Sequence, residues 1–153
     1  RADDRAQVER FGRQRQRTVD PHRRIGRVEH HHARPERPTD GVPVGWCRLG
    51  SRDTFERLAH APSAPRIDDE EVWSVVCFYV HPSAKRSGVA TALLGHALDH
   101  AAKKGARILE GYAVRKGHMN IDAYTGYLPM FLDAGFEPAH EGPRRIVVRR
   151  RLL

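Results

Sequence analysis

The stretch FYVHPSAKRSGVATALL, residues Phe78–Leu94, decides how the chain folds, because it joins the end of a strand, a polar loop and the start of a helix. Pro82 ends the strand, and Gly88 stands just before the helix. A tight loop with a glycine at this junction directs several backbone N–H groups outward, at the positive end of the helix dipole. We therefore expect an anion site that suits phosphate groups, with Lys85 and Arg86 adding positive charge at its rim.

The residues on both sides of this loop predict a strand, a helix and a second strand. The segment VWSVVCFYV, Val72–Val80, is apolar at both parities, as expected for a strand that is covered on both faces. Apolar residues then recur at helical spacing between Val89 and Lys104. This stripe comprises Ala90, Leu93, Leu94, Ala97, Leu98, Ala101 and Ala102. Gly105 ends the helix, and RILEGYAV, Arg107–Val114, predicts a strand parallel to the first.

Shorter elements complete the predicted sheet. They are a strand over 42–49, a short helix capped by Asp53, a helix over 124–134 and a hairpin formed by 136–139 and 145–148. The second of these helices should bury Leu128, Phe131 and Leu132. The alternation of strands and helices predicts an α/β fold.

Apolar residues are distributed unevenly along the 153 residues. Residues 1–40 contain only 8 of them, together with 11 arginines and 7 acids, so we expect a basic arm that is disordered or atypical. Residues 41–153 should form the folded domain. Two cysteines, no apolar run near the length of a membrane span and no apolar leader predict a reduced, cytoplasmic protein.

The loop sequence also bears on which phosphate ligand is bound. Neither GxxxxGK[ST] nor GxGxxG occurs, so the common nucleotide-binding loops are excluded. What remains is Lys85–Ala90, KRSGVA, which resembles the [Q/R]xxGx[G/A] pyrophosphate loop of the GCN5-related N-acetyltransferase (GNAT) superfamily. The resemblance covers Val42–Leu152 and includes Ala134-Gly135-Phe136 after the short helix. It implies a mixed sheet with a central βαβ unit, splayed parallel strands and a C-terminal hairpin.

The same resemblance implies acetyl-CoA as the co-substrate and no metal. Backbone groups near Phe78 and Val80 would pair with the pantetheine arm, which enters the wedge between the splayed strands, and an amide near Val80 would stabilise the oxyanion. Histidines at 30–32 and at 96 and 100 lack further ligands at metal-binding spacing, so we expect no metal site. The residues expected at the cofactor are Phe78, Val80, Lys85, Arg86, Ser87, Gly88, Val89, Ala90 and Thr91.

The candidate catalytic residues are Glu110, Tyr124 and Tyr127. Family members often show the pattern NxxAxxLYxxxGF, whose tyrosine usually protonates the leaving thiolate, but Phe131 stands at that position here. Tyr124 and Tyr127, from the same predicted helix, could replace it. Glu110 is the one carboxylate within an apolar strand next to the expected wedge, which makes it a candidate general base. His118 and Asp122 belong, with these two tyrosines, to the loop–helix corner that an acceptor would approach.

We therefore predict an N-acetyltransferase in which a neutral primary amine directly attacks the thioester of acetyl-CoA. The net charge of +8 leaves open a basic nucleic-acid-binding protein that acts through its arginine-rich arm. Nucleic acid is the less favoured partner, because the arm contains a single aromatic residue and its seven acids dilute its charge. Phe131 leaves open a non-catalytic acyl-CoA sensor. The acceptor and the oligomeric state, a homodimer included, stay open.

Overall fold

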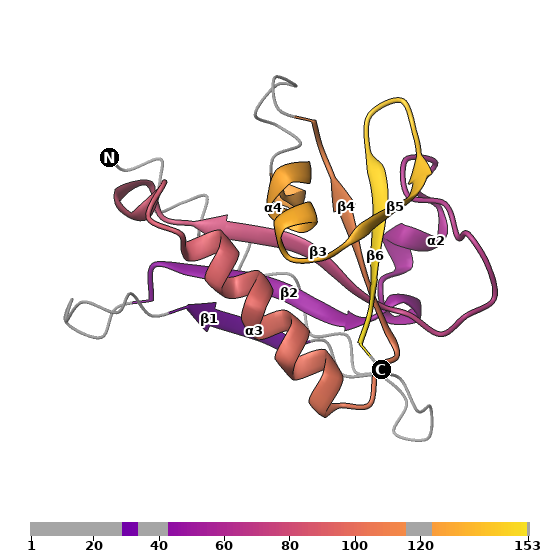
Figure 1. Cartoon of the computed structure of the whole chain (residues 1–153), viewed down its shortest axis with the longest axis horizontal. Helices are drawn as coiled ribbons and strands as arrows, with labels where there is room; N and C mark the ends of the chain where they lie inside the picture. The colour runs from indigo at the N-terminus through magenta and orange to yellow at the C-terminus, as the bar shows by residue number, and fades with distance from the viewer. Residues whose placement is uncertain (1–28, 34–42, 116–123, 153) are drawn as a thin grey trace.

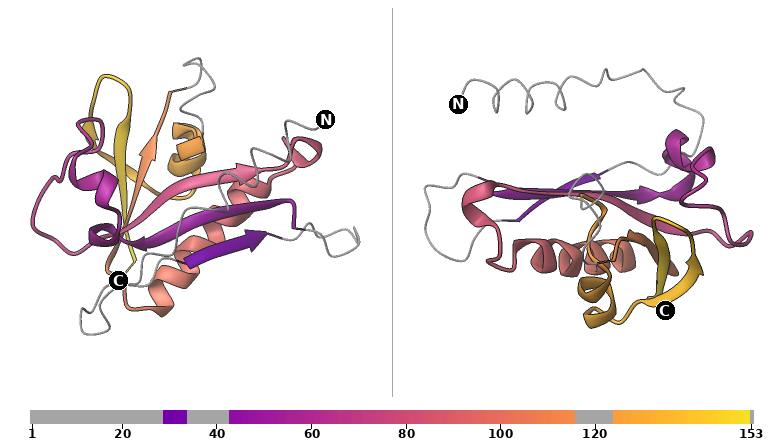
Figure 2. Two further views of the ribbon diagram at one scale, coloured as in Figure 1. Left: turned by 180° about the vertical axis from the view of Figure 1, so that it is seen from behind. Right: turned by 90° about the horizontal axis from the view of Figure 1, so that it is seen from above.

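The computed structural model contains a six-stranded mixed sheet, with α3 and α4 on one face and α2 on the other (Figures 1 and 2). It describes residues 29–33, 43–115 and 124–152. The strands are β1 (Glu29–Ala33), β2 (Gly45–Ser51), β3 (Trp73–Val80), β4 (Ile108–Ala113), β5 (Glu137–Glu141) and β6 (Ile146–Arg151). The helices are η1 (Arg52–Thr54), α2 (Glu56–Ala59), η2 (Pro82–Ala84), α3 (Val89–Lys103) and α4 (Leu128–Asp133).

The central unit of the fold is β3, α3 and β4, as the sequence predicted. The spatial order of the strands is β1-β2-β3-β4-β6-β5. β3 and β4 run parallel, and the other neighbouring strands pair antiparallel. The predicted α/β fold with a mixed sheet, a βαβ unit and a closing hairpin is therefore confirmed. The predicted bounds of these elements are correct to within a few residues.

The first strand lies within residues 1–40, for which the sequence predicted a disordered or atypical arm. Glu29–Ala33 form β1, which pairs antiparallel with β2 from Glu29 opposite Leu49 to Ala33 opposite Gly45. Its sequence, EHHHA, shows no alternation of apolar and polar residues, so nothing in it predicts a strand. A segment of this kind can still form a strand, because strand formation depends strongly on pairing with a neighbouring strand. The predicted arm thus contributes an edge strand, and its remaining residues lie outside the described part of the chain.

Two local predictions are wrong. Asp53 does not cap a helix: α2 begins after Phe55 without a side-chain cap, and Asp53 pairs with Arg66 instead. α4 is shorter than predicted because the backbone of Tyr127 is extended and forms a parallel bridge with Val114.

The short α4 buries fewer side chains than its sequence predicted. Phe131 is fully buried and Leu128 is half-buried, whereas Leu132 is 44% exposed. A helix of six residues has fewer than two turns, so few of its side chains can face the sheet.

The main core lies between the sheet and α3. Both α3 and the middle strands contribute completely buried side chains to this core. These residues are Leu93, Leu94, Ala97 and Ala101 of α3, Val75 of β3, Leu109 and Ala113 of β4, and Val148 of β6. A smaller cluster on the opposite face consists of Ala64, Tyr112 and Val147. The middle strands are thus covered on both faces, which explains why their sequences are apolar at both parities.

Phe131 packs directly on the backbone of β4. A Cβ atom added to Gly111 would clash with Cε1 of Phe131, so the ring occupies the space that a side chain would need. The rings of Phe78 and Phe136 meet that of Phe131 edge to face, with centroids 6.2 and 5.2 Å away. Position 111 therefore requires glycine for reasons of packing.

We predict that Gly111→Ala lowers the free energy of unfolding by about 1–3 kcal/mol, because the new methyl group displaces a ring that has no free space. Gly95→Ala is the matched control, since a Cβ at this exposed position of α3 meets nothing within 4 Å. The control should stabilise the protein by up to about 1 kcal/mol through its higher helix propensity. Urea unfolding measures both changes, and equal stability of the two variants would contradict the packing argument.

Candidate functional site

The parallel strands separate soon after they meet. β3 and β4 pair over three positions, of which the last joins Val75 to Gly111. Beyond this pair β3 continues to Val80 and β4 to Ala113, and Figure 1 shows the two strands diverging. The predicted splaying is therefore present. We call the region between the diverging ends the wedge.

The loop that leaves β3 is fixed at its start. The amide of His81 donates to the carbonyl of Val44, at 2.7 Å, which ties the loop to the chain just before β2. Nδ1 of His81 accepts from the amide of Ser83 at 3.2 Å, at the start of η2. Later in the loop, the hydroxyl of Ser87 donates to the carbonyl of Ala84 at 2.6 Å. These contacts hold an exposed loop in one conformation at the carboxyl end of β3.

The last turn of the loop has the backbone geometry of an anion site. Arg86 and Gly88 both have positive φ angles, of 61° and 81°. Alternating backbone conformations of this kind turn successive N–H groups toward one point. The amide of Ala92 donates to the carbonyl of Gly88 at 2.9 Å, so the three preceding amides of α3 have no carbonyl within the helix to bind. A Cβ at Gly88 would meet nothing within 4 Å, which leaves open space for a ligand.

The structure brings the predicted cofactor residues together at this end of β3. The residues in the turn are exposed, whereas those that belong to β3 or α3 are at least half-buried, apart from Thr91. The exposed ones are Lys85, Arg86, Ser87, Gly88 and Thr91, the half-buried ones are Val80 and Ala90, and the buried ones are Phe78 and Val89. Their contact with a cofactor stays a prediction.

The two predicted tyrosines lie at the end of β4. Val114 donates to the carbonyl of Gly126 at 3.0 Å and accepts from the amide of Leu128 at 2.9 Å, which fixes the segment between them beside the wedge. Tyr124 is 45% exposed and Tyr127 is 36% exposed. His118 and Asp122, the other candidates at this corner, lie outside the described residues.

Arg145 holds the side chain of Tyr124. The Tyr124 hydroxyl accepts from Nη2 of Arg145 at 2.9 Å, and the guanidinium lies 5.4 Å from the centre of the ring. A hydroxyl that accepts one hydrogen bond can still donate its own proton. Phe131, in contrast, is completely buried and has no proton to give.

Glu110 lies within a buried cluster of charged and polar side chains. Its Oε1 accepts from Arg52 and, at 2.7 Å, from the hydroxyl of Tyr112, and its Oε2 accepts from Nε of Arg149 at 2.8 Å. Glu110 and Ser74 are fully buried, and Arg52 is 5% exposed. Burial raises the pKa of Tyr112, and the charge of Glu110 raises it further, so this tyrosine stays protonated.

The cluster is distant from the loop. Glu110 pairs with Ser74, six positions before Val80 on β3, which corresponds to roughly 20 Å along the strand. The structure therefore does not bring Glu110 together with the cofactor residues, and both of its oxygens already bind donors. Its role as a general base stays a prediction, while its contacts indicate that it stabilises the fold.

Sequence reasoning missed the partners of Glu110. A carboxylate within an apolar strand requires a cation, so the sequence did indicate that Glu110 has a basic partner. It could not identify Arg52, which is 58 positions away, or Arg149, which is 39 positions away. Arg149 also donates to Asp68 at 2.5 Å, and this hydrogen bond lowers the pKa of the Asp68 carboxyl. The cluster thus joins β4 and β6 to the connection between β2 and β3.

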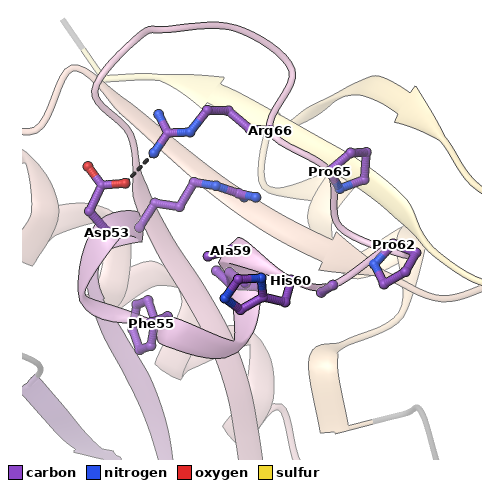
Figure 3. Close-up of a pocket in the computed structure, with 10 residues that line it drawn as sticks. Asp53, Phe55, Ala59, His60, Pro62, Pro65 and Arg66 are labelled. Carbon is purple, nitrogen blue, oxygen red and sulfur yellow. Dashed lines mark hydrogen bonds and ion pairs between the residues drawn. The ribbon is translucent and has the colours of Figure 1, made fainter.

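That connection also encloses a hollow of about 600 Å³ (Figure 3). Arg66 and Asp53 form an ion pair in its wall. The other lining residues are Arg52, Phe55, Leu58, Ala59, His60, Ala61, Pro62 and Pro65. The connection joins the carboxyl end of β2 to the amino end of β3, so the hollow is separate from the loop at the other end of β3.

The described residues offer few alternatives to this loop as a site. Within them, no group of three or more His, Cys, Asp or Glu side chains is arranged to hold a metal ion. None of their helices has the length and apolar character needed to cross a membrane. Burial raises the pKa of the Cys47 thiol to about 12 and also raises that of Cys77. Both cysteines are therefore protonated and poor nucleophiles near neutral pH.

Comparison with known proteins identifies the family of this chain and solved structures with a similar fold. The family model described as "Acetyltransferase (GNAT) family" matches residues 4–125. No curated protein sequence shows a significant match. A GNAT-family protein from Desulfovibrio desulfuricans has 19% identity and a TM-score of 0.51, over 76% of this chain and 66% of that one.

Two further solved structures have similar folds. A ribosomal-protein-alanine N-acetyltransferase from Brucella melitensis has 16% identity and a TM-score of 0.53, over 98% of this chain and 78% of that one. A GNAT-family acetyltransferase from Listeria monocytogenes has 9% identity and a TM-score of 0.52, over 73% of this chain and 59% of that one. The chain thus spans about two thirds or less of the Desulfovibrio and Listeria proteins, and identities this low establish the fold alone.

We predict that Glu110→Gln lowers the free energy of unfolding by roughly 3–5 kcal/mol, because it leaves the buried guanidinium of Arg52 without a counter-charge. Asp53→Asn, which breaks the exposed ion pair with Arg66, should cost less than about 1 kcal/mol. Urea unfolding curves of the two variants provide the measurement. If Glu110→Gln lowers the free energy of unfolding no more than Asp53→Asn does, the cluster contributes little to stability.

Proposed function

Because the chain belongs to the acetyltransferase (GNAT) family, we propose that it transfers an acetyl group from acetyl-CoA to a primary amine. The observation that carries this proposal is the turn at Arg86–Gly88, with its two positive φ angles, at the start of α3 and beside the wedge. Both free cysteines fit the reducing, cytoplasmic compartment that we propose for the reaction.

The turn would hold the pyrophosphate of acetyl-CoA. The amides of Arg86 to Ala90 can converge on phosphate oxygens, and the dipole of the fifteen-residue α3 favours negative charge at this end. The exposed side chain of Lys85 adds a cation at the rim. The open space beside Gly88 allows the backbone to approach the ligand closely.

The pantetheine arm would lie along β3 in the wedge. Beyond Val75, β3 remains paired with β2 as far as Val80, whereas its pairing with β4 has ended. We therefore propose that backbone groups near Phe78 and Val80 bind the extended pantetheine arm, as they would bind another strand. When bound, acetyl-CoA supplies the thioester carbonyl, and we propose that an amide near Val80 stabilises the oxyanion that forms there.

The transfer needs two proton movements. As the amine attacks, the C–N bond forms and the amine loses a proton, and as the C–S bond breaks, the thiolate gains one. We propose Tyr124 or Tyr127 as the donor to the thiolate. Both are exposed at the end of β4, and Arg145 fixes the Tyr124 hydroxyl while leaving its proton available.

We predict that Gly88→Glu abolishes acetyl-CoA binding while the protein stays folded. The side chain would occupy the open space at the turn and place a negative charge beside the pyrophosphate, which should cost several kcal/mol of affinity, or about a thousandfold. Gly105→Glu, at the other end of α3, is a closely matched control. Gly105 has φ 80° and open space as well, so both substitutions strain the backbone alike.

Isothermal titration calorimetry with acetyl-CoA compares the two glycine variants. The wild type and Gly105→Glu should bind, and their melting temperatures should rise by several degrees at saturating ligand. Equal affinity of both variants would show that the turn is not the phosphate site. Absence of binding to the wild type would overturn the proposed function.

We predict that Tyr124→Phe lowers kcat up to about 100-fold, the low end for the loss of a general acid, and leaves the affinity for acetyl-CoA unchanged. Tyr127→Phe should behave in the same way if that hydroxyl is the donor. Steady-state assays of thiol release measure kcat. Full activity of both variants would mean that the thiolate leaves without help, whereas an inactive wild type that still binds acetyl-CoA would indicate a sensor.

A further inference from the structure

We propose that Gly45 is a positioning residue for the cofactor. It sets the start of α3 at the distance from the end of β3 that acetyl-CoA needs in order to contact both elements. We call the turn at Arg86–Gly88, which would hold the phosphates, the phosphate turn. The inference rests on the proposed function and adds to it a buried residue of β2 that belongs neither to the loop nor to the wedge.

Both ends of the loop between β3 and α3 are anchored at the start of β2. At the first end, the amide of His81 donates to the carbonyl of Val44 at 2.7 Å. At the other end, Val89 is the first residue of α3 and its side chain packs over Gly45. A Cβ atom added to Gly45 would lie 2.9 Å from Cγ1 of Val89. The phosphate turn therefore belongs to an arc whose two ends are held by two successive residues.

The first turns of α3 lie closely on β2, and Figure 1 shows the helix crossing over this strand. The same added Cβ atom would lie 3.4 Å from Cδ1 of Leu93. Cys47, two residues along the same face of β2, donates its thiol to the carbonyl of Leu93 at 3.9 Å. Val89 is 7% exposed and Leu93 is completely buried. The start of the helix thus rests on a strand position that has no side chain.

Gly45 also contacts the end of β3. It pairs antiparallel with Val80, and the added Cβ atom would lie 2.8 Å from the carbonyl oxygen of Tyr79. Gly45 is not among the glycines with positive φ, so space rather than backbone conformation requires glycine here. Because ordinary contacts between heavy atoms begin near 3.4 Å, a side chain would force the strand and the helix apart by roughly half an ångström.

This separation matters because acetyl-CoA would contact both elements at once. In the proposed binding mode, the pyrophosphate lies at the phosphate turn and the pantetheine arm lies along β3. Two contacts made by one covalent ligand reinforce each other only where the geometry of the protein permits both together. Gly45 contacts the two elements that provide them, so its missing side chain allows the phosphates and the arm to bind at the same time.

The experiment measures acetyl-CoA affinity by isothermal titration calorimetry and stability by urea unfolding. The wild type is titrated first, because absence of binding there overturns the proposed function itself. Gly45→Ala should weaken binding about tenfold or more. Val147→Ala is the control for lost stability, since this completely buried side chain lies on the face of the sheet opposite α3. The control should destabilise the protein and leave the affinity unchanged.

A second background separates positioning from a general loss of stability. Val89→Ala removes the Cγ1 atom that the new methyl group of Gly45→Ala would meet. In that background Gly45→Ala should weaken binding no more than about threefold, because only the contact with the carbonyl of Tyr79 remains. Equal factors in the two backgrounds would overturn the inference, since a merely structural effect does not depend on this pair.

Val89→Leu tests the same contact from the side of the helix, in case Gly45→Ala does not fold. The longer side chain needs more space between α3 and Gly45 than the contact leaves, so binding should weaken about threefold or more. Circular dichroism establishes which variants are folded. The inference is wrong if folded Gly45→Ala, or Val89→Leu in its place, binds acetyl-CoA as tightly as Val147→Ala does.

Discussion

The contact between Phe131 and Gly111 holds the two parallel strands at the point where they part. Gly111 belongs to the last paired position of β3 and β4, and the ring of Phe131 fills the space above it while also meeting Phe78 of β3. One aromatic side chain therefore touches both strands at the start of the wedge. Because Phe131 belongs to α4, the same contact fixes the segment that carries Tyr124 and Tyr127. Phe131 therefore has a structural role in the core.

The parts of the fold that were predictable from the sequence are those with local signals. The apolar stripe of α3 and the two-sided apolar pattern of β3 each lie within a single segment, and both were identified to within one residue. The loop between them was recognisable because a glycine stands just before the helix, and in the structure Gly88 has a φ of 81°. Its position beside splayed strands was expected only from the resemblance of the loop to the GNAT superfamily.

The parts that were not predictable depend on residues distant in the sequence. β1 exists because β2 offers it hydrogen bonds, and the sequence EHHHA contains no sign of that. The sequence did not show that Glu110 binds two arginines, because these lie in η1 and β6, far from it along the chain. A buried carboxylate is consistent with catalysis and with a stabilising ion pair, and only the location of the cations distinguishes the two.

The order of the strands has a consequence for how the protein matures during synthesis. β6 is the last element of the described chain, yet it lies between β4 and β5 and supplies Arg149 to Glu110. Until the ribosome has released this segment, β4 has an open edge and the carboxylate has only one of its two guanidiniums. The nascent chain therefore keeps a polar, hydrated edge along β4 until β6 has left the ribosome, and the native sheet forms only after that.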